Sequence, residues 1–186
     1  MNNLSPGFTS PLDAQACFRA ILDAFSTPGS PVTLTVPLTP PLGLSVAGAA
    51  VLLTLTDAHT KVALPIESCA HPWLVFHTGA SFVEESEADF CLAHTPSCLP
   101  KLRQGTDAEP EASATLILDV EHLNGMNFRL SGPGLKDSVT VELPFGKAFL
   151  LDWQAQTNNA PRGVDIILCA GKQILALPRS LHIEEG

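Results

Sequence analysis

The feature that most constrains the fold is a pair of apolar segments near the C-terminus, joined at a glycine. Residues 164–170 read V-D-I-I-L-C-A and residues 172–177 read K-Q-I-L-A-L, with Gly171 between them. Two such runs that meet at a glycine are typical of a β-hairpin. A surface hairpin would alternate apolar and polar residues, whereas these arms are apolar on both faces. The sequence therefore predicts two strands inside a sheet that is covered on both sides.

One carboxylate, Asp165, lies inside the first arm. Burying it would cost several kcal/mol unless it were paired, and Arg179 beyond the second arm is the expected partner. A three-residue loop would place both residues on one face, and a two-residue loop on opposite faces, because a one-residue shift reverses the side chains. The sequence leaves this register open. We interpret the two residues as a structural ion pair, with a catalytic acid as the alternative.

The hydrophobic spacing predicts three helices. The first begins at Ser10–Asp13, where a serine cap, a proline and an aspartate suit a helix start, and its apolar face comprises Ala14, Cys17, Phe18, Ile21, Leu22 and Phe25. The second, residues 45–55, is uncharged on all sides and is expected to lie against the central sheet. The third spans about residues 145–156, with Phe149, Leu150 and Trp153 on its buried face.

Further short strands are predicted at residues 32–36, 61–64, 73–77, 89–93, 114–120 and 127–131. Asn124-Gly125 favours a tight turn between the last two. Helices alternate with hairpins and crossovers, which indicates an α/β fold with a mixed β-sheet covered by helices. A chain of 186 residues is the size of one domain, so residues 1–186 are read as a single domain.

Five segments, in this order along the chain, carry a family resemblance. They are D-A-Q-A-C-F-R-A-I-L-D-A-F-S-T-P-G from Asp13, V-L-L-T-L-T-D from Val51, F-H-T-G-A from Phe76, P-E-A-S-A-T-L-I-L from Pro110, and the C-terminal G-V-D-I-I-L with G-K-Q-I-L-A-L-P-R-S. Together they resemble the H subunit of the bacterial carbon-phosphorus lyase core complex, a family of phosphonate utilisation. The resemblance runs nearly from end to end.

This resemblance implies an accessory, non-catalytic subunit whose partners are the other carbon-phosphorus lyase core subunits. It implies support for the formation of a ribose 1-phosphonate 5-triphosphate from ATP and an alkylphosphonate. Cleavage of the carbon-phosphorus bond would belong to an iron-sulfur subunit, for which the dispersed cysteines here are unsuited. The implied fold is similar to the large domain of pyridoxal-phosphate-dependent transferases, without that cofactor. Relatives tend to pair, so a homodimer is expected for the isolated chain.

The charge balance limits the classes of partner. Ten basic and nineteen acidic residues give a net charge of −9, and no basic stripe appears, so binding to nucleic acid is not expected. A site for a phosphonate and a triphosphate would gather several Lys or Arg residues, which the sequence does not show. Hydrophobic residues make up 45% of the chain and charged residues 16%, a composition that favours association through exposed apolar area.

The N-terminus has neither a basic start nor an apolar core, and the five cysteines are odd in number, which together indicate a reducing cytoplasm and free thiols. The uncharged stretch 24–56 is interrupted by prolines 28, 31, 37, 40 and 41, so no membrane span is predicted.

Cys91, His94 and Cys98, with His71 or His77 as a fourth group, are the nearest approach to a metal cluster. Their spacing matches no common zinc pattern, and ordinary core and loop residues are the favoured interpretation. Cys91 with His94 or His77 could instead serve a free-standing small hydrolase or transferase, which is the alternative function. Acidic residues upstream of Cys91 oppose a thiolate there.

Two further candidates are weaker. Ser131–Gly134 could offer backbone N–H groups to a phosphate in a small-ligand module, although Pro133 has none and a strand-ending turn is the simpler interpretation. Lys172 could form a Schiff base, but its neighbours offer no phosphate cup for a pyridoxal cofactor. The sequence therefore predicts no catalytic residue, cofactor site or metal site in this chain.

Overall fold

The structure, a computed structural model, describes residues 4–65 and 68–186. The helices and strands follow one another as α1 (Pro11–Ser26), β1 (Val32–Thr33), α2 (Val46–Leu55), β2 (Lys61–Ala63), α3 (Ala70–Thr78), β3 (Ser81–Phe82), β4 (Phe90–Ala93), β5 (Thr115–Asp119), β6 (Met126–Ser131), β7 (Val139–Leu143), α4 (Lys147–Thr157), β8 (Asp165–Ala170), β9 (Gln173–Leu177) and β10 (His182–Glu185). Short 3-10 helices are η1 (Glu85–Glu87), η2 (Pro96–Lys101) and η3 (Pro110–Ala112).

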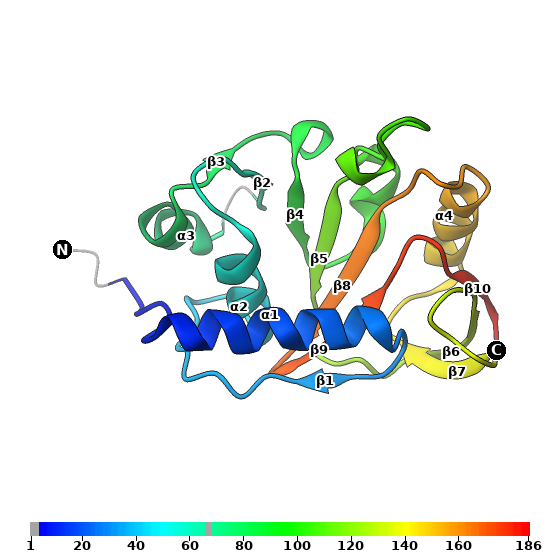
Figure 1. Cartoon of the computed structure of the whole chain (residues 1–186), viewed down its shortest axis with the longest axis horizontal. Coiled ribbons are helices and arrows are strands. Elements are labelled where there is room, and N and C mark those ends of the chain that lie inside the picture. Colours follow the sequence, from blue (N-terminus) through cyan, green and yellow to red (C-terminus); the bar gives the residue numbers. More distant parts are fainter. Residues whose placement is uncertain (1–3, 66–67) are drawn as a thin grey trace.

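The central element is a seven-stranded mixed sheet in the order β1-β9-β8-β5-β4-β2-β3 (Figure 1). Strands β8, β5, β4, β2 and β3 are mutually parallel, whereas β9 runs antiparallel to both of its neighbours, β8 and β1. The predicted C-terminal hairpin is confirmed as β8 and β9. Because Ala170 pairs with Gln173, its loop has two residues, Gly171 and Lys172. The predicted α/β class with a mixed sheet is confirmed.

Both faces of this sheet are covered, as the apolar hairpin arms predict. Alternate residues along β5 and β8 face opposite sides: Ile117, Ile167 and Cys169 pack in one apolar cluster with α1, α2 and α3. Leu116 and Leu118 pack in the other cluster, with α4 and the second sheet. Figure 1 shows α1 running lengthwise across the sheet, with α4 and β10 at the end of the molecule opposite α3. The seven-stranded sheet is therefore the middle of three layers.

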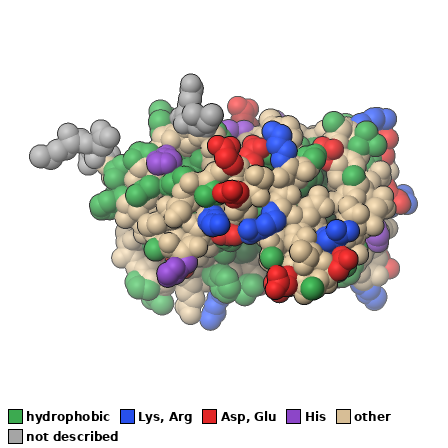
Figure 2. All heavy atoms as spheres, turned by 90° about the horizontal axis from the view of Figure 1, so that it is seen from above, with side chains coloured by type: hydrophobic (Ala, Val, Ile, Leu, Met, Phe, Trp, Pro, Cys, Tyr) green, Lys and Arg blue, Asp and Glu red, His purple; other side chains and the backbone are tan. Residues whose placement is uncertain are grey.

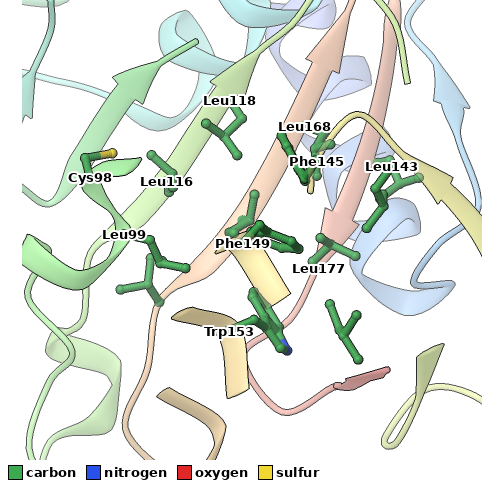
Figure 3. Close-up of a cluster of buried hydrophobic side chains, with 14 of the residues drawn as sticks. Cys98, Leu99, Leu116, Leu118, Leu143, Phe145, Phe149, Trp153, Leu168 and Leu177 are labelled. Atoms are coloured by element: carbon green, nitrogen blue, oxygen red, sulfur yellow. The ribbon is translucent and has the colours of Figure 1, made fainter. Parts of the chain in front are cut away.

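Helix α4 closes the second cluster, in the place where the sequence predicts a helix. Figure 3 shows Phe149 and Trp153 of α4 among the leucines of the sheet. The indole N–H of Trp153 donates to the carbonyl of Leu181 at 3.0 Å. Gln156, which is buried, donates to the carbonyl of Val164 at 3.1 Å and accepts from its N–H at 2.9 Å. These bonds satisfy buried polar groups. The Trp153 bond ties α4 to the residue before β10, and the Gln156 bonds tie it to the residue before β8.

The first predicted helix forms, but its apolar face is wider than its buried face. Ser10 and Asp13 form the capping box, in which Asp13 accepts from the N–H of Ser10 at 3.0 Å. Cys17 and Ile21 are buried against the sheet layer, as predicted. Phe18 and Leu22, predicted on the buried face, are instead 46% and 50% exposed. The prediction was wrong for these two residues, and α1 carries apolar side chains to the surface.

The strand predicted at residues 73–77 is wrong, because these residues lie in α3. The run W-L-V-F is apolar enough for either structure, but Trp73 and Leu74 are buried while Val75 and Phe76 are exposed, as one helix face requires. Gly79 ends the helix in the left-handed conformation, with φ of 72°. The glycine that follows the run is the signal that favours a helix.

The two strands on either side of Asn124-Gly125, where a tight turn is predicted, do not pair with each other. Strand β5 lies in the large sheet, whereas β6 belongs to a separate three-stranded antiparallel sheet in the order β10-β6-β7. Strands β7 and β10, which complete that sheet, are absent from the sequence prediction. The second sheet covers one side of the core through Phe128, Leu130 and Ile183.

Helix α2 lies against β5 and β8 in the large sheet, as predicted from its uncharged, small residues. Its residues from Ala47 to Leu52 are all buried. Within the part of the chain that the structure describes, no helix combines the length and the apolar character needed to cross a membrane.

Candidate functional site

A hollow of about 970 Å³ lies along β2 and β4, between η1 and η2. Its floor includes Ala63, Cys91 and Ala93 from the two strands. Its charged lining consists of Glu84, Glu85 and Glu87. No Lys or Arg is among the described residues that line it, so the hollow is acidic. A triphosphate or a phosphonate would meet like charge there.

Three residues that sequence analysis grouped together, Cys91, His94 and Cys98, do line this one hollow. Strand β4 supplies Cys91 and ends just before His94, and η2 supplies Cys98. Both thiols are buried, at 2% and 4% exposure. The predicted grouping of these three is therefore present in space.

Each of the two thiols shifts the pKa of the other. The Cys91 thiol lowers the pKa of Cys98, an effect that burial opposes. The pKa of Cys91 is raised by the Cys98 thiol, by burial and by the nearby charge of Glu85. Cys98 is therefore the thiol that ionises first, and Cys91 is a poor nucleophile.

His71 and His77 do not join this group to make a metal site. Both lie on α3: the ring of His71 stacks on Phe82 with centroids 3.9 Å apart, and His77 Nε2 lies 3.1 Å from the carbonyl of Ser5. Across residues 4–65 and 68–186, no three His, Cys, Asp or Glu side chains are placed so that they could hold a metal ion together.

A second polar cluster lies at the carboxyl end of β5, where Asp119 is the last residue. Its Oδ2 accepts from the backbone N–H of Ser45, the cap of α2, at 2.8 Å. Its Oδ1 is buried and finds no donor among the described residues. Burial raises the pKa of the Asp119 carboxyl, and the hydrogen bonds from Ser45 and the nearby His94 ring partly oppose that rise.

Gly48 lets α2 approach this carboxylate closely. A Cβ at residue 48 would lie 2.8 Å from Asp119 Oδ2. The N–H of Gly48 donates to the Ser45 hydroxyl at 2.9 Å. The small residue is thus required by the contact between helix and carboxylate.

His94 connects the two clusters. Its Nδ1 lies 2.8 Å from the backbone carbonyl of Asp119, and because a carbonyl oxygen can only accept, Nδ1 carries a hydrogen. In the neutral ring, Nε2 is then an acceptor. His94 also lines a second hollow of about 330 Å³ together with Asp119, Glu121 and His122. These groups can accept hydrogen bonds or a proton, but they offer no fixed cation to an anionic substrate.

Asp165 and Arg179 do meet, although the hairpin loop has two residues. Asp165 Oδ1 accepts from the backbone N–H of Arg179 at 2.7 Å, and the Arg179 guanidinium lies 3.7 Å from Oδ2. Arg179 lies beyond the end of β9, so the alternation of faces no longer applies to it. Its guanidinium also donates to the hydroxyl of Ser113. The pair closes the end of the hairpin, which agrees with the structural interpretation.

Ser131–Gly134 forms the turn that leaves β6, in which the N–H of Leu135 donates to the carbonyl of Gly132 at 3.1 Å. This arrangement is the strand-ending turn of the simpler interpretation. Lys172 lies exposed in the β8–β9 turn. Its carbonyl accepts from the N–H of Leu34 at 2.8 Å, so its backbone supports the sheet edge.

The similarity of this chain to known proteins extends over nearly its whole length. The family model described as "Bacterial phosphonate metabolism protein (PhnH)" matches residues 6–184. The chain belongs to this family. The match includes all fourteen named helices and strands except the last residue of β10.

Two curated relatives agree. The chain is 36% identical to "Alpha-D-ribose 1-methylphosphonate 5-triphosphate synthase subunit PhnH" of Rhizobium meliloti (strain 1021), over 97% of this chain and 95% of that protein. It is 31% identical to "Putative C-P lyase subunit protein HtxG" of Stutzerimonas stutzeri, over 91% of this chain and 85% of that protein. Both similarities span the family fold, and the family resemblance inferred from the sequence is confirmed.

Sequence reasoning missed the cluster of Ser45, Gly48 and Asp119 in this family member. The available signal was a single acid, Asp119, at the end of the apolar run A-T-L-I-L. A carboxylate at the carboxyl end of a buried parallel strand is a usual place for a functional group in α/β proteins. Its partner Ser45 is distant in the sequence, so the pairing required the fold.

Proposed function

We propose that this chain is an accessory, non-catalytic subunit of the carbon-phosphorus lyase core complex. In that role it supports the formation of ribose 1-phosphonate 5-triphosphate from ATP and an alkylphosphonate during phosphonate catabolism. The observation that carries the proposal is the 36% identity, over 97% of the chain, to a protein named as a subunit of the methylphosphonate synthase. The similarity to a putative C-P lyase subunit supports the same role.

The distribution of charge supports the non-catalytic part of the proposal. The charged residues that line the 970 Å³ hollow are three glutamates, and five basic residues are already engaged in ion pairs, namely Lys101, Arg103, Lys147, Arg162 and Arg179. Figure 2 shows basic and acidic side chains next to one another on the face seen from above. Phosphate and phosphonate groups need convergent cations, so we expect the substrates to bind in other subunits.

Exposed apolar side chains support the proposed partners. Phe18 and Leu22 of α1, and Val75 and Phe76 of α3, are between 43% and 71% exposed. In Figure 2, hydrophobic side chains gather toward the end of the molecule where Figure 1 places α3. Apolar area of this kind commonly marks interfaces. We propose that it serves contacts with other core subunits, and a homodimer when the chain is isolated.

Three further parts of the proposal concern fold and location. Residues 1–186 form one domain, supported by a family match over residues 6–184. The domain is related to the large domain of pyridoxal-phosphate-dependent transferases without the cofactor, supported by the helix-covered mixed sheet. The protein works in the cytoplasm, supported by five free cysteines.

One observation favours the alternative, a free-standing hydrolase or transferase: Cys91 and His94 line the same hollow. The raised pKa of Cys91 and the neighbouring Glu85 argue against it, because both disfavour the thiolate that a nucleophile requires.

Co-purification tests the proposed role directly. The tagged chain should retain the other core subunits when all of them are expressed together in cells that carry the phosphonate pathway. A paired exposed-face variant, Phe18→Ser with Phe76→Ser, should remain folded and lose partners, while Glu184→Gln, an exposed change elsewhere, should not. Failure of the unmodified chain to retain any core subunit would refute the accessory role.

A further inference from the structure

Two hollows adjoin at the carboxyl ends of the parallel strands. The 970 Å³ hollow reaches Ala63 and Ala93, the last residues of β2 and β4, and the 330 Å³ hollow reaches Asp119, the last residue of β5. His94 lines both hollows. The carboxyl edge of parallel strands is the usual place for ligands in α/β proteins. We refer to the two hollows together as the carboxyl-edge groove.

We propose that the carboxyl-edge groove binds an extended segment of another protein subunit, and that this segment is rich in lysine or arginine. This contact rests on the proposed accessory role, because it belongs to the assembly of the chain with other subunits. Three properties of the groove point to such an occupant: the charge of its walls, the apolar residues of its floor, and its volume.

The walls of the groove carry carboxylates, and no Lys or Arg is among the described residues that line it. Glu84, Glu85 and Glu87 line one hollow, and Glu121 lines the other. Glu85 is already paired with Lys101 at 3.3 Å. Glu84 and Glu87 are exposed, and neither takes part in an ion pair within the part of the chain that the structure describes. Charge complementarity therefore selects a basic occupant.

His94, where the two hollows adjoin, adds an acceptor for the same occupant. Its Nδ1 carries a hydrogen, because it lies 2.8 Å from the backbone carbonyl of Asp119, so Nε2 of the neutral ring accepts. A lysine ammonium or an arginine guanidinium has only donors to offer. The hydrogen-bonding character of His94 thus matches that of the carboxylates on either side of it.

The floor of the 970 Å³ hollow suits the apolar stem of a basic side chain. Ala63, Cys91 and Ala93 on this floor are small and apolar, and Phe82 and Val83 also line the hollow. Lys and Arg bury their methylene stems along apolar surface and keep the charged head beside carboxylates or water. The apolar floor and the acidic wall provide both environments for one side chain.

The volume of the groove favours a polypeptide over a small cation. Pockets for small molecules commonly hold about 300–1,000 Å³, and the 970 Å³ hollow alone reaches the upper end of that range. The groove also reaches β3, the edge strand of the large sheet, because Phe82 lines it. An edge strand has backbone groups on its outer side with which an extended segment can pair. A small polyamine would use the charge of the groove but neither its volume nor this edge.

The first test measures binding of a short peptide of alternating lysine and alanine to the full isolated chain. NMR chemical-shift mapping locates the contact, and fluorescence anisotropy of the labelled peptide gives the affinity. The backbone signals of Val83, Ala93 and Ser97, which line the groove, should shift, while that of Phe18 on α1 should not. A peptide of alternating glutamate and alanine should cause no shifts. Shifts spread over the whole surface, or none with the lysine peptide, would overturn the proposal.

A pair of charge reversals tests the wall itself. Glu84→Lys with Glu87→Lys should weaken binding of the lysine peptide at least about tenfold, because the cationic peptide then meets like charge. Glu109→Lys with Glu111→Lys is the matched control: it makes the same change in net charge at exposed residues that line neither hollow, and it should change the affinity less than about twofold. Glu84→Gln with Glu87→Gln should give a smaller loss with less risk to folding. Equal weakening in the reversal and control variants would overturn the groove as the binding site.

A small cation is the competing occupant. Spermidine that binds more tightly than the lysine peptide, with the same NMR shifts, would overturn the choice of a polypeptide.

Co-expression with the other core subunits then separates this contact from the accessory role. The chain with Glu84→Lys and Glu87→Lys should retain less of at least one subunit than the Glu109 and Glu111 control retains. Full retention by both variants would overturn the groove as a subunit contact and leave the accessory role standing. Failure of the unmodified chain to retain any subunit would refute the accessory role, and this contact with it.

Discussion

Replacing Asp165 tests whether the ion pair holds the hairpin end. Alanine removes the acceptor for the Arg179 backbone N–H, a charge-assisted hydrogen bond of 2.7 Å worth about 1.5–3 kcal/mol. The ion pair at 3.7 Å adds little, because its side chains are 27% and 23% exposed and such pairs contribute roughly 0–1 kcal/mol. We expect Asp165→Ala to lower the free energy of unfolding by about 2 kcal/mol.

Asp165→Asn keeps an oxygen acceptor and loses the charge, so its cost should be about 1 kcal/mol. For a chain of 186 residues, each kcal/mol shifts Tm by roughly 2–4 °C, so calorimetry separates the two variants. Glu185→Ala is the matched control, because it breaks the exposed Lys147–Glu185 ion pair and should cost under about 0.5 kcal/mol. Equal, near-zero losses for both Asp165 variants would refute the reasoning.

Three other expectations follow from the described contacts. Gly48→Ala should lower the free energy of unfolding by about 1–2 kcal/mol despite better helix propensity, because the added Cβ meets the Asp119 carboxylate. A loss below about 0.5 kcal/mol in urea unfolding would contradict this contact. Burial raises the folded-state pKa of Asp119, so the protonated carboxyl contributes stability at low pH and this contribution is lost as pH rises. Asp119→Asn should therefore gain stability relative to the unmodified chain from about pH 4 upward. A difference in stability that does not change with pH would show that the pKa of this carboxyl is not perturbed. All five thiols should react with Ellman's reagent in denatured protein that has met no oxidant, and a count below five would indicate a disulfide or a retained metal.

Local patterns predicted those parts of the fold that depend on neighbouring residues. The apolar arms around Gly171 give β8 and β9, and the capping residues Ser10 and Asp13 give the start of α1. The run 73–77 was assigned wrongly, because an apolar run of that length fits a strand or a helix equally and Gly79 carried the deciding signal.

Contacts between segments that are distant along the chain could not be predicted from the sequence. The separation of β5 and β6 into two sheets depends on β7 and β10. The run V-T-V-E-L of β7 alternates apolar and polar residues and was an available strand signal, whereas β10, H-I-E-E, is short and mostly polar. In the candidate site, too, groupings of nearby residues could be predicted and contacts between distant residues could not. Cys91 and Cys98 are close in the sequence and could be grouped, whereas Asp119 meets Ser45 across 74 residues. Asp165 stood out because it interrupts an apolar run, while Asp119 merely ends one.

The most direct test of the accessory role is reconstitution of the synthase reaction. ATP and methylphosphonate should give no product with the purified chain alone, and should give product with the complete set of core subunits. Omitting the chain from that set should abolish turnover, and adding it back should restore it, with Cys91→Ala restoring it equally well. Turnover by the chain alone, abolished by Cys91→Ala, would contradict the account.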